Sequence, residues 1–162
     1  MRRSMRARAL FVLIAAALVS GISCANAQGN WFGIRSGYPL GVTLHYGVAN
    51  GFGPGADLRV SGRLVVDQNG SRFGLGLDAM HTVAAASPFS VYLGGGPAVE
   101  FGSGVALLDV HGLVGSEFRF VDLGMPQLGL FAEGTLGARI GISGISSRFP
   151  TFGAALGVNY HF

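Results

Sequence analysis

The chain has 162 residues, of which 49% are hydrophobic, only 12% are charged and 28 are glycine. Soluble globular chains carry about 25% charged residues and about 7% glycine, so this composition is atypical of them, and its apolar content excludes solvating disorder. All 11 basic residues are arginine, and four of these lie within the first eight residues. Residues 28–162 contain the other seven arginines and all eight acidic residues. No basic patch is left, which excludes a nucleic-acid partner, and the length favours one domain.

Residues 1–27 have the layout of an export signal. Arg2–Arg8 form a cationic stretch, Leu10–Val19 form a ten-residue apolar run, and Ala25-Asn26-Ala27 supplies an A-x-A cleavage motif. The apolar run is too short for a membrane-spanning helix, which needs about 20 residues. We therefore expect signal-peptide removal near Ala27 and a mature domain over residues 28–162.

Cys24 offers an alternative, in which the cysteine becomes a lipidated N-terminus. The preceding residues, Gly21-Ile22-Ser23, are unlike the Leu-Ala-Gly that usually comes before such a cysteine. Cleavage after Ala27 would leave the mature chain without cysteine, and thus without disulfide or thiol chemistry.

The mature chain alternates apolar with small or polar residues, which is the pattern of β-strands with two different faces. Residues 40–48 show this well, because Leu40, Val42 and Leu44 share one face while Gly41 and Thr43 share the other. Turn residues such as Gly, Asn and Pro separate the segments. Eight strands are predicted, at about residues 30–38, 40–48, 56–66, 71–80, 89–100, 105–120, 127–140 and 151–162.

Charged residues within these strands all fall on the face opposite the bulky apolar residues, a face that is also rich in glycine. There are twelve of them: Arg35, Asp57, Arg59, Arg63, Arg72, Asp78, Glu100, Asp109, Glu117, Arg119, Glu133 and Arg139. If the apolar face pointed inward, as in a soluble barrel, its large side chains would overfill an eight-stranded interior. If it points outward into lipid, the small residues and a balanced set of six arginines and six carboxylates fill the lumen. The pattern therefore predicts an all-β fold, an eight-stranded antiparallel transmembrane β-barrel of outer-membrane type.

The chain ends in Val158-Asn159-Tyr160-His161-Phe162, an alternating strand with a terminal phenylalanine. With the export signal and the strand pattern, this ending resembles the small outer-membrane β-barrels of the OmpA/OmpX type, over essentially the whole mature chain. The resemblance implies a bacterial outer-membrane protein in contact with outer-membrane lipids. It also implies that Val158, Tyr160 and Phe162 form the signal read by the barrel-assembly machinery. An even number of strands places both termini on the same side, which the resemblance implies is the periplasmic side, and the connections at the opposite end look short.

The function follows less directly from the sequence than the fold. Paired lumen charges favour a packed lumen and a structural, non-enzymatic role in the cell envelope, with the protein as a monomer. A narrow channel for very small solutes or small apolar molecules is one alternative. The other is a lipid-modifying enzyme, which would need Ser, His and an acid near the lipid boundary. His45, His111 and His161 have lumen parity and His81 lies at a strand end, a distribution that predicts no metal site, no catalytic residue and no cofactor.

Overall fold

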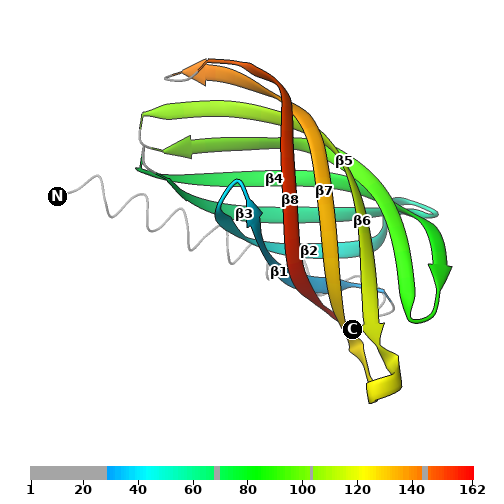
Figure 1. The fold of residues 1–162 in the computed structure, drawn as a ribbon. Coiled ribbons are helices and arrows are strands. Elements are labelled where there is room, and N and C mark those ends of the chain that lie inside the picture. The colour runs from blue at the N-terminus through cyan, green and yellow to red at the C-terminus, as the bar shows by residue number, and fades with distance from the viewer. Residues whose placement is uncertain (1–28, 68–69, 103, 144–145) are drawn as a thin grey trace, which may run out of the picture.

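The structure, a computed structural model, describes residues 29–67, 70–102, 104–143 and 146–162. The predicted export signal, residues 1–27, and Cys24 within it lie outside these residues. The described residues form eight antiparallel strands that close into a barrel, each strand pairing with its neighbours in chain order and the last with the first (Figure 1). The predicted eight-stranded antiparallel barrel is thus confirmed. The strands are β1 (Trp31–Tyr38), β2 (Gly41–Gly53), β3 (Ala56–Asp67), β4 (Gly70–Ala86), β5 (Phe89–Gly102), β6 (Val105–Phe120), β7 (Met125–Ser143) and β8 (Arg148–His161).

Two strands run well beyond the ends predicted from the alternation. β4 continues to Ala86 rather than residue 80, and its register shifts between Thr82 and Ala84. An extra residue at such a bulge breaks the period of two, so the pattern hides the continuation. β2 continues to Gly53 through a similar irregularity after Val48.

The pairing staggers the strands around the barrel. A path drawn perpendicular to the strands from Trp31 passes through the successive partners on β2 to β7 and reaches β8 at Thr151. Trp31 itself pairs with His161, ten residues further along β8. A stagger of this size over eight strands tilts them by about 40° from the barrel axis.

The two ends of the barrel differ. Phe162 N donates a hydrogen bond to Asn30 O at 3.0 Å, so the described N-terminal residues and the C-terminus lie together at one end, called here the terminus end. The other end is called the far end, and its connections between strands are at most four residues long. At the terminus end, β6 and β7 are joined by the 3-10 turn η2 (Val121–Leu123). Within the described ranges, no helix has the length and hydropathy to cross a membrane.

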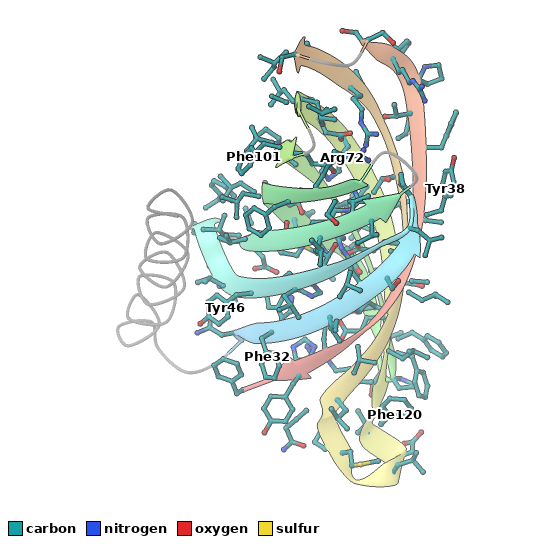
Figure 2. The ribbon with its side chains drawn as sticks, turned by 90° about the vertical axis from the view of Figure 1, so that its left-hand side faces the viewer. Phe32, Tyr38, Tyr46, Arg72, Phe101 and Phe120 are labelled. Carbon is teal, nitrogen blue, oxygen red and sulfur yellow. The ribbon has the colours of Figure 1, made fainter. Side chains whose placement is uncertain are left out.

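The outer wall of the barrel is apolar and carries aromatic rings toward both ends (Figure 2). Leu40 and Leu156, for example, are 76% and 66% exposed. Rings in contact near the terminus end are Phe32–Tyr160, Tyr160–Phe162, Tyr46–Phe162, Phe89–Phe118 and Phe118–Phe120, with centroids 5.0 to 6.3 Å apart. Phe73 and Phe101 form a pair toward the far end, at 6.0 Å. An apolar band between two aromatic girdles is the exterior of a transmembrane barrel.

The lumen holds large apolar side chains as well as charges, which corrects the prediction that only small and charged residues fill it. Trp31, Met80, Tyr92 and Leu113 form a buried cluster inside it, and Phe131 is 1% exposed. These residues share the inward parity of the charges on their strands. The lumen is therefore packed with aromatic and aliphatic groups in addition to small and charged residues.

Lumen glycines make room for these rings. Trp31 pairs with Gly47, Tyr92 with Gly115, and Phe131 with Gly157 on the adjacent strand. A Cβ atom at any of these three glycines would lie 2.0 to 2.4 Å from an atom of the ring. Each ring therefore covers the glycine opposite it, as in sheets where an aromatic side chain shields a cross-strand glycine.

This complementarity predicts that Gly47→Ala destabilises the barrel by about 1–3 kcal/mol, the usual range for overpacking. Trp31, the only tryptophan, must move, so its fluorescence should change together with the urea midpoint of the refolded protein. Gly62→Ala is the matched control, because a Cβ there meets no atom within 4 Å. Equal midpoints for the two variants would contradict this account of the lumen.

Candidate functional site: the charged lumen

Four charged residues meet at mid-height in the lumen, and we call Arg35, Arg59, Asp78 and Glu133 the central ion cluster. Nε and Nη2 of Arg59 each donate to Asp78 Oδ2 at 3.0 Å. Nη1 of Arg59 donates to Glu133 Oε1, and Nη1 of Arg35 donates to Glu133 Oε2. The side chains of Arg59, Asp78 and Glu133 are only 1% exposed.

Alternation and closure together build this cluster. Its members come from four strands, β1, β3, β4 and β7, at positions that point inward from each. Two guanidinium groups meet two carboxylates, so the cluster is neutral, and the Tyr92 hydroxyl donates a further hydrogen bond to Glu133 Oε1 at 3.0 Å. Buried charges are retained only when they are paired and hydrogen-bonded in this way.

A second charged group lies between the central ion cluster and the far end. Glu100 lies between Arg63 and Arg72, with N–O distances of 3.4 and 3.6 Å, and Arg139 donates to Asp109 Oδ2 from Nε and Nη2 at 3.3 and 3.2 Å.

His111 links this far-end group to the central ion cluster. Its Nδ1 lies 3.3 Å from Asp109 Oδ1, and its Nε2 lies 3.1 Å from Asp78 Oδ1. One imidazole thus spans the two carboxylates, so the charges form a continuous network over the far half of the lumen.

A third group lies near the terminus end. His161 Nε2 donates to Glu117 Oε1 at 2.5 Å, because its Nδ1 accepts a hydrogen bond from Arg119 Nη2 at 2.9 Å and a guanidinium can only donate. Asn159 Nδ2 donates to Glu117 Oε2 at 3.2 Å, and His45 Nε2 donates to Asn159 Oδ1 at 2.8 Å. In a serine hydrolase, the second ring nitrogen faces the nucleophile. Here that nitrogen is occupied by an arginine.

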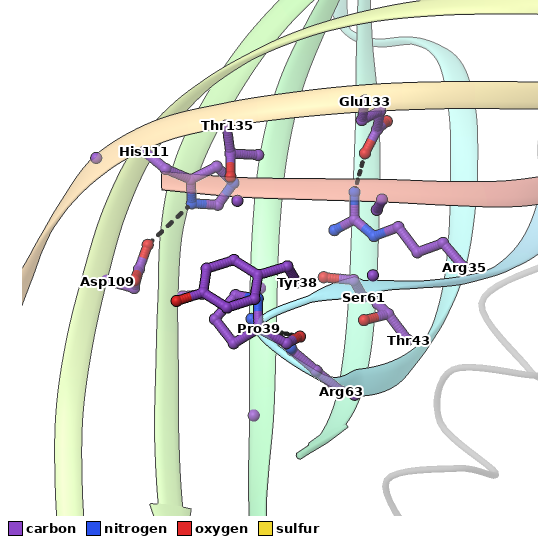
Figure 3. Close-up of a pocket in the computed structure, with 18 of the residues that line it drawn as sticks. Arg35, Tyr38, Pro39, Thr43, Ser61, Arg63, Asp109, His111, Glu133 and Thr135 are labelled. Atoms are coloured by element: carbon purple, nitrogen blue, oxygen red, sulfur yellow. Dashed lines mark hydrogen bonds and ion pairs between the residues drawn. The ribbon is translucent and has the colours of Figure 1, made fainter. Parts of the chain in front are cut away.

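Two cavities lie on either side of the central ion cluster. The far-end cavity has a volume of about 100 Å³ and is lined by polar groups that include Arg35, Arg63, Asp109 and His111 (Figure 3). The terminus-end cavity has a volume of about 110 Å³, and its lining includes Trp31, Tyr92 and His161. Arg59 lines the second cavity and Glu133 the first, so the ion pair between them separates the two spaces.

Eleven of the twelve charged residues singled out from the sequence lie in ion pairs within the lumen. The exception is Asp57, whose Oδ1 accepts a hydrogen bond from the backbone N of Asn50 at 2.8 Å. Sequence reasoning missed the roles of His111, Asn159 and Tyr92 in the network. The alternation along each strand predicts that these three side chains point inward. Their partners depend on the register between strands, which the alternation does not give.

The remaining candidate residues are placed as follows. Val158, Tyr160 and Phe162 lie on the outer wall and are 42% to 43% exposed. His81 Nδ1 donates to Gly55 O at 2.6 Å at the terminus end. Among the described residues, no three His, Cys, Asp or Glu side chains are grouped so that they could hold a metal ion.

Glu133→Gln should strongly destabilise the barrel, because it leaves Arg35 and Arg59 buried with a single carboxylate. Breaking a buried ion pair costs about 3–5 kcal/mol, and the urea midpoint of the protein refolded into detergent micelles measures the loss. Asp122→Asn, which removes an exposed carboxylate from η2, is the control and should leave the midpoint unchanged. If the two variants unfolded at the same urea concentration, the central ion cluster would not contribute to the stability of the barrel.

No family model matches the sequence, and no curated protein matches it either. Solved structures match the fold. Neisserial surface protein A (NspA) matches with a TM-score of 0.56 at 14% identity, over 83% of this chain and 94% of that chain. The N-terminal β-barrel domain of Pseudomonas aeruginosa OprF has a TM-score of 0.55 at 14% identity, over 83% and 96%. A de novo designed transmembrane β-barrel has a TM-score of 0.53 at 15% identity, over 85% and 98%. The chain therefore has the fold of the small eight-stranded outer-membrane barrels, the fold class predicted from its strand pattern.

Proposed function

We propose that the protein is an integral protein of a bacterial outer membrane with a structural, non-enzymatic role in the cell envelope. The observation that carries this proposal is the central ion cluster, which occupies the lumen at mid-height between two small cavities. Arg59 and Glu133 are buried there and satisfy each other's charge. A barrel filled in this way is suited to be a rigid, stable body in the membrane.

The outer wall supports the membrane location. Apolar side chains cover it, and aromatic rings gather toward both ends, so the barrel is matched to lipid rather than to water. We infer that the chain is exported and loses its signal peptide near Ala27. The terminus end of the assembled barrel then lies in the periplasm. Outer-membrane lipids then surround a monomer.

The C-terminal strand supports a route of assembly. Val158 and Tyr160 on β8 and Phe162 directly after it lie on the outer wall, where another protein can contact them before the barrel closes. We assign these three residues to the signal recognised by the barrel-assembly machinery.

Fractionation of cells that express the precursor tests location and assembly together. The 135-residue mature chain should appear in the outer membrane and migrate differently on gels before and after boiling, because a closed barrel resists detergent. Deletion of Phe162 should reduce the amount of heat-modifiable protein in that membrane, whereas Leu123→Ser, at an exposed site on η2, should not. A soluble periplasmic protein would contradict the membrane location, and full assembly without Phe162 would contradict the signal.

Planar lipid bilayers test the structural role against a channel. The refolded wild-type protein should give no steady current, since the central ion cluster closes the lumen. The same preparation must show the gel shift of a folded barrel, so that a silent bilayer reflects a closed lumen. Reproducible unit currents from the folded wild-type protein would favour a narrow channel for small solutes instead.

A further inference from the structure

The far-end rim of the barrel is notched at β1 and β2. Pairing between β1 and β8 ends at Tyr38 and Ala154, but β8 begins six residues earlier in the chain, at Arg148. The segment Arg148–Gly153 thus runs for about 20 Å with β7 on one side and no β1 partner on the other. We call the gap between this segment and the turn at residues 39–40 the rim notch.

The far-end cavity lies directly behind the rim notch. Its lining includes Tyr38 and Pro39 from the turn and Thr151, Phe152 and Gly153 from the open edge of β8. Figure 3 shows the Arg63 side chain beside Pro39, and both residues line this cavity. A group entering over the turn would therefore meet Arg63 without passing through the barrel.

Arg63 is suited to hold an anion. Its Nη2 donates to Pro39 O at 2.9 Å, and its Nη1 lies 3.4 Å from Glu100 Oε1. Among the described residues these contacts engage two of the five N–H donors of the guanidinium. Its side chain is 27% exposed, far more than that of Arg59. Glu100 also lies 3.6 Å from Arg72, so Arg63 does not have this carboxylate to itself.

The outer face of the rim notch is apolar. Tyr38, Leu40 and Phe152 are 72%, 76% and 65% exposed on the outer wall. The notch therefore joins a polar cavity to an apolar wall at the height of the far-end aromatic residues. Three arginines and three carboxylates line that cavity: Arg35, Arg63, Arg139, Glu100, Asp109 and Glu133. The cavity and the wall match the two parts of an amphiphile.

We propose that the rim notch binds one amphiphile with an anionic headgroup, such as a phosphate monoester carrying an alkyl chain. The headgroup enters the far-end cavity over Pro39 and accepts hydrogen bonds from Arg63, and the chain lies against Tyr38, Leu40 and Phe152. This inference rests on the membrane location proposed above, which brings lipid chains to that wall. A free anion would use Arg63 alone, whereas an amphiphile uses both surfaces and binds more tightly by the burial of its chain.

Titration of the refolded protein in a neutral maltoside detergent tests the site. The mature chain has seven arginines, so ¹⁵N-arginine side-chain NMR spectra are simple and can be assigned from variants. The probes are dodecyl phosphate and inorganic phosphate. Both probes should shift the Arg63 Nε–H signal, and the shift should saturate. Dodecyl phosphate should reach half-saturation at a concentration about tenfold or more below that of inorganic phosphate, because burial of a few methylene groups is enough for such a gain in affinity.

Three variants make the test specific. Dodecyl phosphate should also shift the signal of Arg139, which lines the same cavity, and Arg63→Gln should abolish that shift. Arg119→Gln, at the terminus end, should leave the Arg63 response intact. Leu40→Ser should weaken dodecyl phosphate binding but not inorganic phosphate binding. Leu123→Ser, at a position far from the notch that is 68% exposed against 76% for Leu40, should change neither. If Arg63→Gln does not fold, the comparison of Leu40→Ser with its control Leu123→Ser still tests the proposal.

Each contrary result overturns the proposal. Equal affinity for the two phosphates would indicate a free-anion site, and an equal, unsaturated shift at Arg119, whose side chain is 46% exposed at the terminus end, would indicate charge uptake by the micelle alone. Absence of any Arg63 shift in the folded protein would exclude a ligand there. The gel shift of each sample reports the folded barrel independently, so failure here leaves the membrane location to be judged by fractionation.

Discussion

The contact between Arg59 and its two carboxylates is the constraint on which the rest of the lumen depends. Arg59 on β3 reaches Asp78 on the neighbouring strand and Glu133 across the barrel on β7, and Glu133 also pairs with Arg35 on β1. A charge so deeply buried persists only with a partner, so these strands must close at one register. Aliphatic side chains on the outer wall discriminate less between registers, since one is as well solvated by lipid as another. The contacts inside the lumen therefore contribute most to specific closure.

Glycines and aromatic rings solve the remaining packing problem. An eight-stranded barrel is barely wide enough for its own side chains, and here it holds Trp31, Tyr92 and Phe131 in addition to the charges. Each ring lies over a glycine on the adjacent strand. The high glycine content thus reflects the volume available in the lumen. It also explains why a chain with so many glycines forms a regular, closed sheet.

The stagger of the strands makes the two ends unlike. Because β8 extends past the end of β1, the far-end rim is low on one side, while β4 to β7 lengthen the terminus end. Pro150 lies in the part of β8 that has no β1 partner, and a residue without an N–H discourages pairing of such an edge with another strand. The same stagger carries Arg63 close to the rim and keeps Arg59 at mid-height. Two arginines of identical parity consequently meet different surroundings.

Particular residues show which features the sequence predicts and which depend on the closed barrel. Alternation alone determined the strands, the closed barrel and the inward direction of the charges, because a side-chain period of two admits only two faces and charged groups cannot face lipid. It did not reveal the ends of β2 and β4, where bulges interrupt the period. Nor could it pair Arg59 with Glu133, seat Trp31 on Gly47, or place His111 between two aspartates. Those contacts depend on strand register and on distances across the barrel, which exist only once all eight strands have closed.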